Sequence, residues 1–169
     1  MMNSGVAVQS KHLVDGLINT GKYKFIQIGA AKSHSDYSPV KINEDLIIIP
    51  FQGFGSKDVI RSLLVTEKPD AMIIFNDPRF FDKVFEIEDE IHQVCPILYW
   101  HVWDNRPFPD FNRHIYEATD MINCISYLTH NVLKYEYDNK VSYIPHSLPQ
   151  SLFFKLQDEE KLSYKERIL

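Results

Sequence analysis

Few cysteines and no long apolar run limit what this chain can be. Its two cysteines, Cys95 and Cys124, lie at the start of one predicted strand and inside another, so we interpret both as reduced core residues. No apolar stretch approaches the roughly 20 residues of a membrane span, and the first residues lack the basic and apolar regions of a signal peptide. The sequence therefore predicts an intracellular, cytoplasmic protein without a transmembrane segment.

An excess of basic charge and a clustered set of histidines are also missing. The 18 lysines and arginines stand against 23 aspartates and glutamates, and the net charge of −5 provides no attraction for nucleic acid. The seven histidines are scattered singly, without the paired spacing of a zinc or haem site. We therefore expect neither a nucleic-acid partner nor a metal centre.

What the chain does contain is typical of one folded domain. Its 169 residues are enough to bury a substantial core but not to form a second full domain. Hydrophobic residues make up 44% and charged residues 24%, which argues against disorder.

Five apolar runs each become polar at their carboxyl end. Continuous apolar runs are typical of a parallel sheet that is buried on both faces, and such sheets bind ligands beyond the carboxyl ends of their strands. The runs span residues 46–52, 71–77, 97–104, 122–126 and 141–146. The polar residues expected to meet at one rim of the sheet are Asp77, His101, Asp104, Ser126 and His146.

Segments with helical spacing alternate with these runs, and this alternation predicts an α/β fold built from right-handed βαβ units. The fold class that we expect is a Rossmann-like three-layer sandwich with a mostly parallel sheet. Residues 23–28 are predicted to form a further strand, and residues 30–45 are predicted to form a loop. The predicted helices cover residues 6–18, 57–67, 80–94, 112–119 and 129–137, with a charged terminal stretch from about residue 158.

A doubly wound sheet normally opens on a strand, whereas this chain opens on a glycine turn and a helix. We therefore expect that the first strand is missing and that both ends of the chain are cut. Residues 1–155 would form the domain, and residues 156–169 would begin a linker toward an absent second domain. Without the first strand, residues 23–28 and 71–75 should either pair directly or leave an open edge through which the chain forms a homo-oligomer.

Several segments follow one another in an order that is typical of one family. They include Asn3-Ser4-Gly5-Val6-Ala7, Lys68-Pro69-Asp70-Ala71, Tyr99-Trp100-His101-Val102-Trp103-Asp104 and Tyr143-Ile144-Pro145-His146. In the order and spacing of these motifs, the chain resembles the N-terminal half of a GT-B retaining glycosyltransferase of glycosyl transferase group 1, the family 4 type. The resemblance covers nearly the whole chain.

The resemblance implies transfer of a sugar from a nucleotide-sugar donor to an acceptor. In such enzymes the N-terminal domain holds mostly the acceptor and the C-terminal domain holds mostly the donor. The nucleotide-sugar is then a substrate, and no separate cofactor is implied. This chain alone would be an inactive fragment, because most of the donor site lies in the other domain.

The resemblance also implies site residues. It assigns contact with the donor phosphates to Ser4 and Gly5, since the N-terminus of a helix attracts anions. It assigns a role at the reaction centre to His101, and the nearby Asp104 is our second catalytic candidate. A structural interpretation stands beside each: Ser4 is a helix cap, His101 is a core histidine, and Asp77 caps the helix that follows it.

Other functions stay open from the residues alone. A nucleotide-sugar epimerase shares the architecture and needs acid and base groups, which His101 and Asp104 could supply. A non-catalytic binding module of the flavodoxin or receiver type is the other alternative, although a receiver needs an acidic cluster that Asp77 and Asp104 do not obviously form. The aromatic, proline-rich residues 105–112 suit an acceptor wall or a loop that packs on its own domain.

Overall fold

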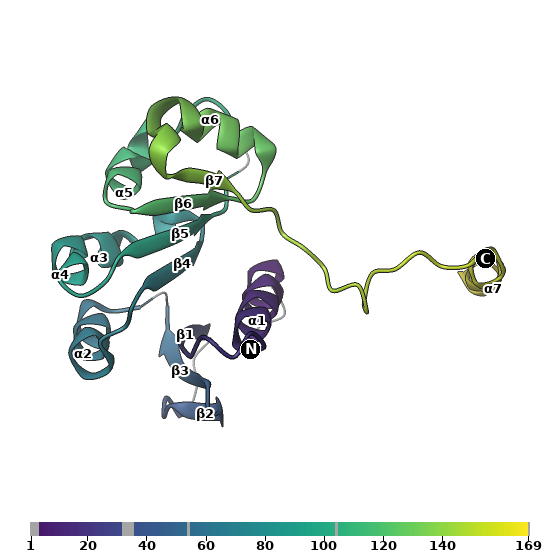
Figure 1. Cartoon of the computed structure of the whole chain (residues 1–169), viewed down its shortest axis with the longest axis horizontal. Coiled ribbons are helices and arrows are strands. Elements are labelled where there is room, and N and C mark those ends of the chain that lie inside the picture. The colour runs from purple at the N-terminus through teal and green to yellow at the C-terminus, as the bar shows by residue number, and fades with distance from the viewer. Residues whose placement is uncertain (1–3, 32–35, 54, 104, 169) are drawn as a thin grey trace.

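The computed structural model of the chain describes residues 4–31, 36–53, 55–103 and 105–168. Helices and strands alternate along it, and the strands form two separate sheets (Figure 1). In chain order the elements are α1 (Gly5–Ile18), β1 (Phe25–Ala31), β2 (Val40–Asn43), β3 (Leu46–Gln52), α2 (Lys57–Glu67), β4 (Met72–Asn76), η1 (Pro78–Phe80), α3 (Asp82–Phe85), α4 (Glu88–His92), β5 (Ile97–His101), η2 (Asp110–Asn112), α5 (Arg113–Glu117), β6 (Met121–Cys124), α6 (Tyr127–Tyr137), η3 (Asp138–Lys140), β7 (Val141–Tyr143) and α7 (Asp158–Ile168).

The larger sheet contains four parallel strands in the order β4-β5-β6-β7. Each strand pairs with the next strand in the sequence, and the intervening helices make the crossovers that parallel strands require. This arrangement confirms the predicted α/β class with a mostly parallel sheet, and it is compatible with a Rossmann-like fold.

The hydrophobic core lies between this sheet and helices α2 to α6. Alternate residues of a strand face the same side, and in β5 Ile97, Tyr99 and His101 are fully buried on the side of the core. Cys95 and Cys124 are free thiols buried in the same cluster, as predicted. Helix residues that complete the core include Ile60, Leu64, Val84, Phe85, Ile91, Ile115 and Leu133.

The other face of the larger sheet is only partly covered. Ile73, Leu98 and Met121 lie side by side on this face, because the strand register pairs Ile73 with Leu98 and Leu98 with Met121. Ile73 and Met121 are both exposed. Figure 1 places α1 on this side, opposite α2 and α4, and α1 contacts the edge strand β4. On this second face of the sheet, α1 is thus the helix that occupies the position of the predicted second helical layer.

The smaller sheet has the order β1-β3-β2. Strands β1 and β3 are parallel, whereas β2 runs antiparallel to β3. The prediction of a loop over residues 30–45 is wrong at β2. Its Val40 and Ile42 are exposed, so this short edge strand lacks the continuous buried run by which the other strands were recognised.

No backbone pairing joins β1 to β4 among the described residues, so direct closure of the two sheets is not found there. Each of these strands lies at the edge of its own sheet. Of the two outcomes expected for a missing first strand, the open edge is the one that fits this arrangement. Self-association through such an edge stays a prediction.

The single helix predicted over residues 80–94 is wrong in its continuity. The structure has η1, α3 and α4 in its place, and the backbone leaves the helical region at Ile87, with φ −125° and ψ 25°. Val84, Phe85, Ile87 and Ile91 are nevertheless all buried. Their apolar spacing identified the buried face correctly but did not reveal the break.

Beyond β7 the chain leaves the sheets as an extended segment and ends in α7 (Figure 1). The apolar side chains of Leu152, Phe153 and Phe154 in this segment are exposed. Most of the region predicted to begin a linker, residues 156–169, lies in α7, and its role as a linker stays a prediction.

Candidate functional site

The carboxyl ends of the four parallel strands meet in one row. The register pairs Asn76 with His101, His101 with Cys124, and Cys124 with Tyr143. The residues that follow these strand ends therefore lie along one rim, as the sequence predicted for Asp77, Ser126 and His146. Asp104, which was predicted for the same rim, lies outside the described residues.

His101 is the last residue of β5 and is fully buried. Its ring packs edge-on against Tyr99 and Tyr116, with ring centroids 5.3 and 5.1 Å apart. Burial lowers the pKa of the imidazole from 6.5 to about 3, although the nearby Asp77 carboxylate partly opposes this shift. His101 is therefore neutral at physiological pH.

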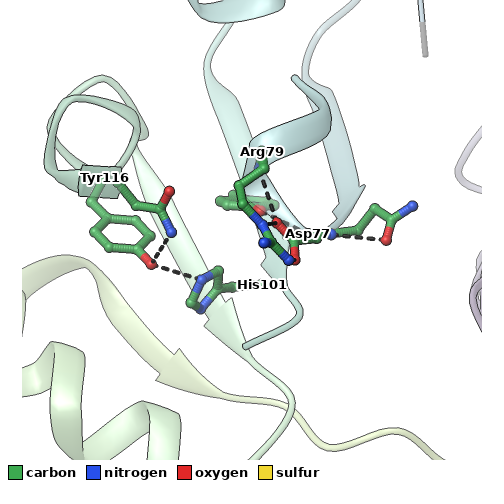
Figure 2. A network of polar contacts seen from close by, with 7 residues as sticks. Asp77, Arg79, His101 and Tyr116 are labelled. Atoms are coloured by element: carbon green, nitrogen blue, oxygen red, sulfur yellow. Dashed lines mark hydrogen bonds and ion pairs between the residues drawn. The ribbon is translucent and has the colours of Figure 1, made fainter. Parts of the chain in front are cut away.

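The two ring nitrogens of His101 have different surroundings. Nε2 lies 2.9 Å from the Tyr116 hydroxyl, as Figure 2 shows. Nδ1 is buried and has no hydrogen-bond partner among the described residues. A buried polar atom without a partner is uncommon, because it loses its hydrogen bonds to water on folding. His101 thus combines a core position with one unused polar atom.

Asp77 follows β4 and pairs with Arg79 (Figure 2). Its carboxylate accepts hydrogen bonds from the backbone N–H of Arg79 at 3.0 Å and from the Arg79 guanidinium at 2.6 and 2.9 Å. These bonds hold the pKa of Asp77 below its ordinary value. Asp77 is the N-cap of η1, which is the structural role that the following proline indicated.

Ser4 caps α1, since its hydroxyl oxygen accepts the backbone N–H of Ala7 at 3.2 Å. No acidic residue lies in the first turn of this helix, so its N-terminus is not already neutralised by a side chain. A Cβ at Gly5 would meet nothing within 4 Å, and the structure therefore gives no steric reason for a glycine there.

Gln9 ties α1 to the rim, and sequence reasoning missed it. Its amide nitrogen donates to the Ser147 carbonyl at 2.9 Å, and its amide oxygen accepts the Ser147 N–H at 3.3 Å. The two residues are 138 positions apart. This contact brings Gln9, in the first half of α1, beside the chain that leaves β7.

His146 and Ser126 both take part in packing at the rim. The His146 ring meets Trp100 and Phe75 edge-on, with centroids 5.2 and 5.4 Å apart, and burial lowers its pKa. Ser126 caps α6 by accepting the Thr129 N–H at 3.1 Å. The Thr129 hydroxyl also donates to the carbonyl of Trp103 and so holds the segment that follows β5.

The aromatic residues of the segment 105–112 divide between the two roles left open by the sequence. Phe108 packs on the domain, because its ring lies 5.9 Å from Tyr116 and 6.2 Å from Tyr137. Phe111 is exposed, with its ring 5.6 Å from that of Trp103. Of Phe108 and Phe111, only Phe111 is available to a ligand.

A polar cavity of about 600 Å³ lies at the opposite end of the sheet. The Asp120 carboxylate there accepts the Ile97 N–H at 2.7 Å and contacts His92 at 3.0 Å. These contacts join the start of β5 to the start of β6, so we assign the Asp120 carboxylate a structural role. The cavity is lined by Glu88, His92, His114, Glu117, Ala118, Thr119, Asp120, Asn139 and Lys140.

Metal ligands do not gather in this chain as far as the structure describes it: no group of three His, Cys, Asp or Glu residues is arranged to hold an ion. Within the same ranges, none of the helices has both the length and the apolar character needed to cross a bilayer. No protein-family model matches the sequence, and no curated protein matches it either.

Proposed function

We propose that this chain is the acceptor-side domain of a GT-B nucleotide-sugar glycosyltransferase. One observation carries the proposal. The carboxyl ends of a four-stranded parallel sheet bring His101, the Asp77–Arg79 pair and His146 to a single rim, and Gln9 holds the N-terminal half of α1 beside them. Ligands of open α/β sheets bind at such a rim.

The chemistry of His101 favours sugar transfer over epimerisation. An epimerase needs a group that gains and loses a proton near neutral pH, and an imidazole with a pKa of about 3 is poorly matched to that task. A neutral imidazole instead offers a hydrogen bond to a sugar oxygen without taking a proton. The described part of the proposed site thus supports binding and orientation of a sugar better than acid–base catalysis.

A receiver-type module is also less well supported. The Asp77 carboxylate is already used by Arg79 and by the cap of η1, and its pKa is lowered by these contacts. A phosphoacceptor aspartate would need its carboxylate available to a phosphoryl donor. The second aspartate candidate, Asp104, lies outside the described residues.

The proposal divides the reaction between two domains. The charges that develop on the sugar and on the leaving phosphate would be stabilised in a dry cleft, to which this domain contributes one wall. Since His101 Nδ1 is covered in the isolated domain, a substrate oxygen reaches it only when the residues over it move aside. The first turn of α1 would face the donor phosphates.

We expect the isolated chain to transfer no sugar and to bind nucleotide-sugars only weakly, because most of the donor site belongs to the other domain. Calorimetric titration with uridine, guanosine and adenosine diphosphate sugars measures this affinity, and a transfer assay on simple sugar acceptors measures activity. A dissociation constant in the low micromolar range, roughly −8 kcal/mol, would contradict the division between domains. Sugar transfer by this chain alone would contradict it as well.

A further inference from the structure

Three buried side chains form a chain of hydrogen bonds behind the rim. Asn112 Nδ2 donates to the Tyr116 hydroxyl oxygen at 3.3 Å, and that hydroxyl lies 2.9 Å from His101 Nε2. Asn112 lies at the end of η2, Tyr116 lies four residues later on α5, and His101 ends β5. All three are almost completely buried, so water does not compete for these bonds.

The protons in this series of three hydrogen-bonded side chains can be counted. Burial raises the pKa of Tyr116, so its phenol keeps its single proton. The phenol oxygen already accepts from Asn112, and in the described part of the structure its own O–H has His101 Nε2 as an acceptor within reach. If Nε2 accepts this proton, it carries none itself. The one proton of the neutral imidazole is then on Nδ1.

We propose that Asn112 and Tyr116 are positioning residues that hold His101 as the tautomer with its proton on Nδ1. Nδ1 is the ring nitrogen without a partner among the described residues, so the tautomer leaves one uncharged N–H donor at the end of β5. Its complement is an acceptor oxygen, and a sugar hydroxyl is the acceptor that the proposed function provides. Only that identification of the ligand rests on the proposed function, because the tautomer follows from the protein contacts.

Nitrogen NMR of the isotope-labelled chain at neutral pH tests the tautomer directly, since protonated and unprotonated ring nitrogens resonate in separate regions. We expect an unprotonated Nε2 and a protonated Nδ1, with the Nδ1–H form in roughly tenfold excess, about the effect of one buried hydrogen bond. A His101 protonated on Nε2 in the unaltered chain would overturn the proposal, and this measurement needs no variant.

Tyr116→Phe removes the hydroxyl and tests the positioning role. We expect the ratio of the Nδ1–H form to the Nε2–H form to invert, because an unconstrained neutral histidine side chain prefers the Nε2–H form. Asn112→Leu should reduce the excess of the Nδ1–H form without inverting the ratio. Tyr137→Phe is the matched control, because it removes the hydroxyl of a ring that packs 6.1 Å from Tyr116 and leaves the oxygen beside His101 in place. An unchanged ratio in Tyr116→Phe would overturn the positioning role. If that variant does not fold, an unchanged ratio in Asn112→Leu would do so.

The outcome is independent of sugar binding. A confirmed tautomer in a chain that binds no nucleotide-sugar would contradict the proposed function and leave the positioning role intact. A chain that binds nucleotide-sugar at the rim but carries the proton on Nε2 would contradict the positioning role alone.

Discussion

Acidification from pH 6.5 toward pH 3 is expected to remove several kcal/mol of stability through His101 alone. The folded state lowers the pKa of this histidine from 6.5 to about 3, so the unfolded chain takes up the proton more readily. The stability that this difference provides is complete above pH 6.5 and is lost as the pH falls toward 3. The loss amounts to ~1.4 kcal/mol per pH unit, or roughly 2 kcal/mol by about pH 5.

Urea denaturation at a series of pH values measures this slope. His101→Gln removes the titrating group, so its stability should change less steeply between pH 6.5 and about pH 5, by ~1.4 kcal/mol per pH unit. His114→Gln is the control, because it removes an exposed imidazole at the opposite end of the sheet from His101. The pKa of His146 is also lowered by burial, so some slope in the same direction should persist in both variants. Equal slopes in His101→Gln and the unaltered chain would contradict the buried, neutral state assigned to His101.

Leu133→Ala is expected to lower the free energy of unfolding by about 2–5 kcal/mol, through lost burial and the cavity that remains. Leu133 lies on α6 and is 0% exposed within the core beneath the four-stranded sheet. The matched control is Leu152→Ala, because Leu152 is 68% exposed and should cost less than about 0.5 kcal/mol. Urea denaturation of both variants measures the difference. A loss below about 1 kcal/mol for Leu133→Ala would mean that α6 does not pack on this sheet as described.

The four-stranded sheet was predictable because its strands carry their own signal. The runs that became β4 and β5 are apolar over most of their length, end in polar residues and alternate with helical segments. Parallel strands then require that their carboxyl ends lie at one rim, so the positions of Asp77 and His101 followed from the pattern alone. The cap formed by Asp77 was equally local, since Pro78 follows it directly.

Features that depend on distant residues were not predictable. The break at Ile87 and the exposed strand β2 lie in segments whose periodicity does not distinguish the observed structure from a continuous helix or a loop. The partner of His101 is a tyrosine on a different element, 15 residues later, and nothing in the local sequence indicates that contact. The same holds for Gln9. The sequence alone indicates a surface residue of an amphipathic helix, and only the folded structure shows its contact with Ser147.

Binding of nucleotide-sugars at the carboxyl rim of the four-stranded sheet can be measured by amide NMR of the isotope-labelled chain. Uridine, guanosine and adenosine diphosphate sugars would be added stepwise, because this method detects weak binding and also locates it. Binding at this rim predicts that shift changes for at least one donor concentrate at residues 4–9, 77–79 and 101–103. Changes confined to His92, Asp120 and Lys140 at the opposite end, or no change with any donor at millimolar concentration, would contradict it.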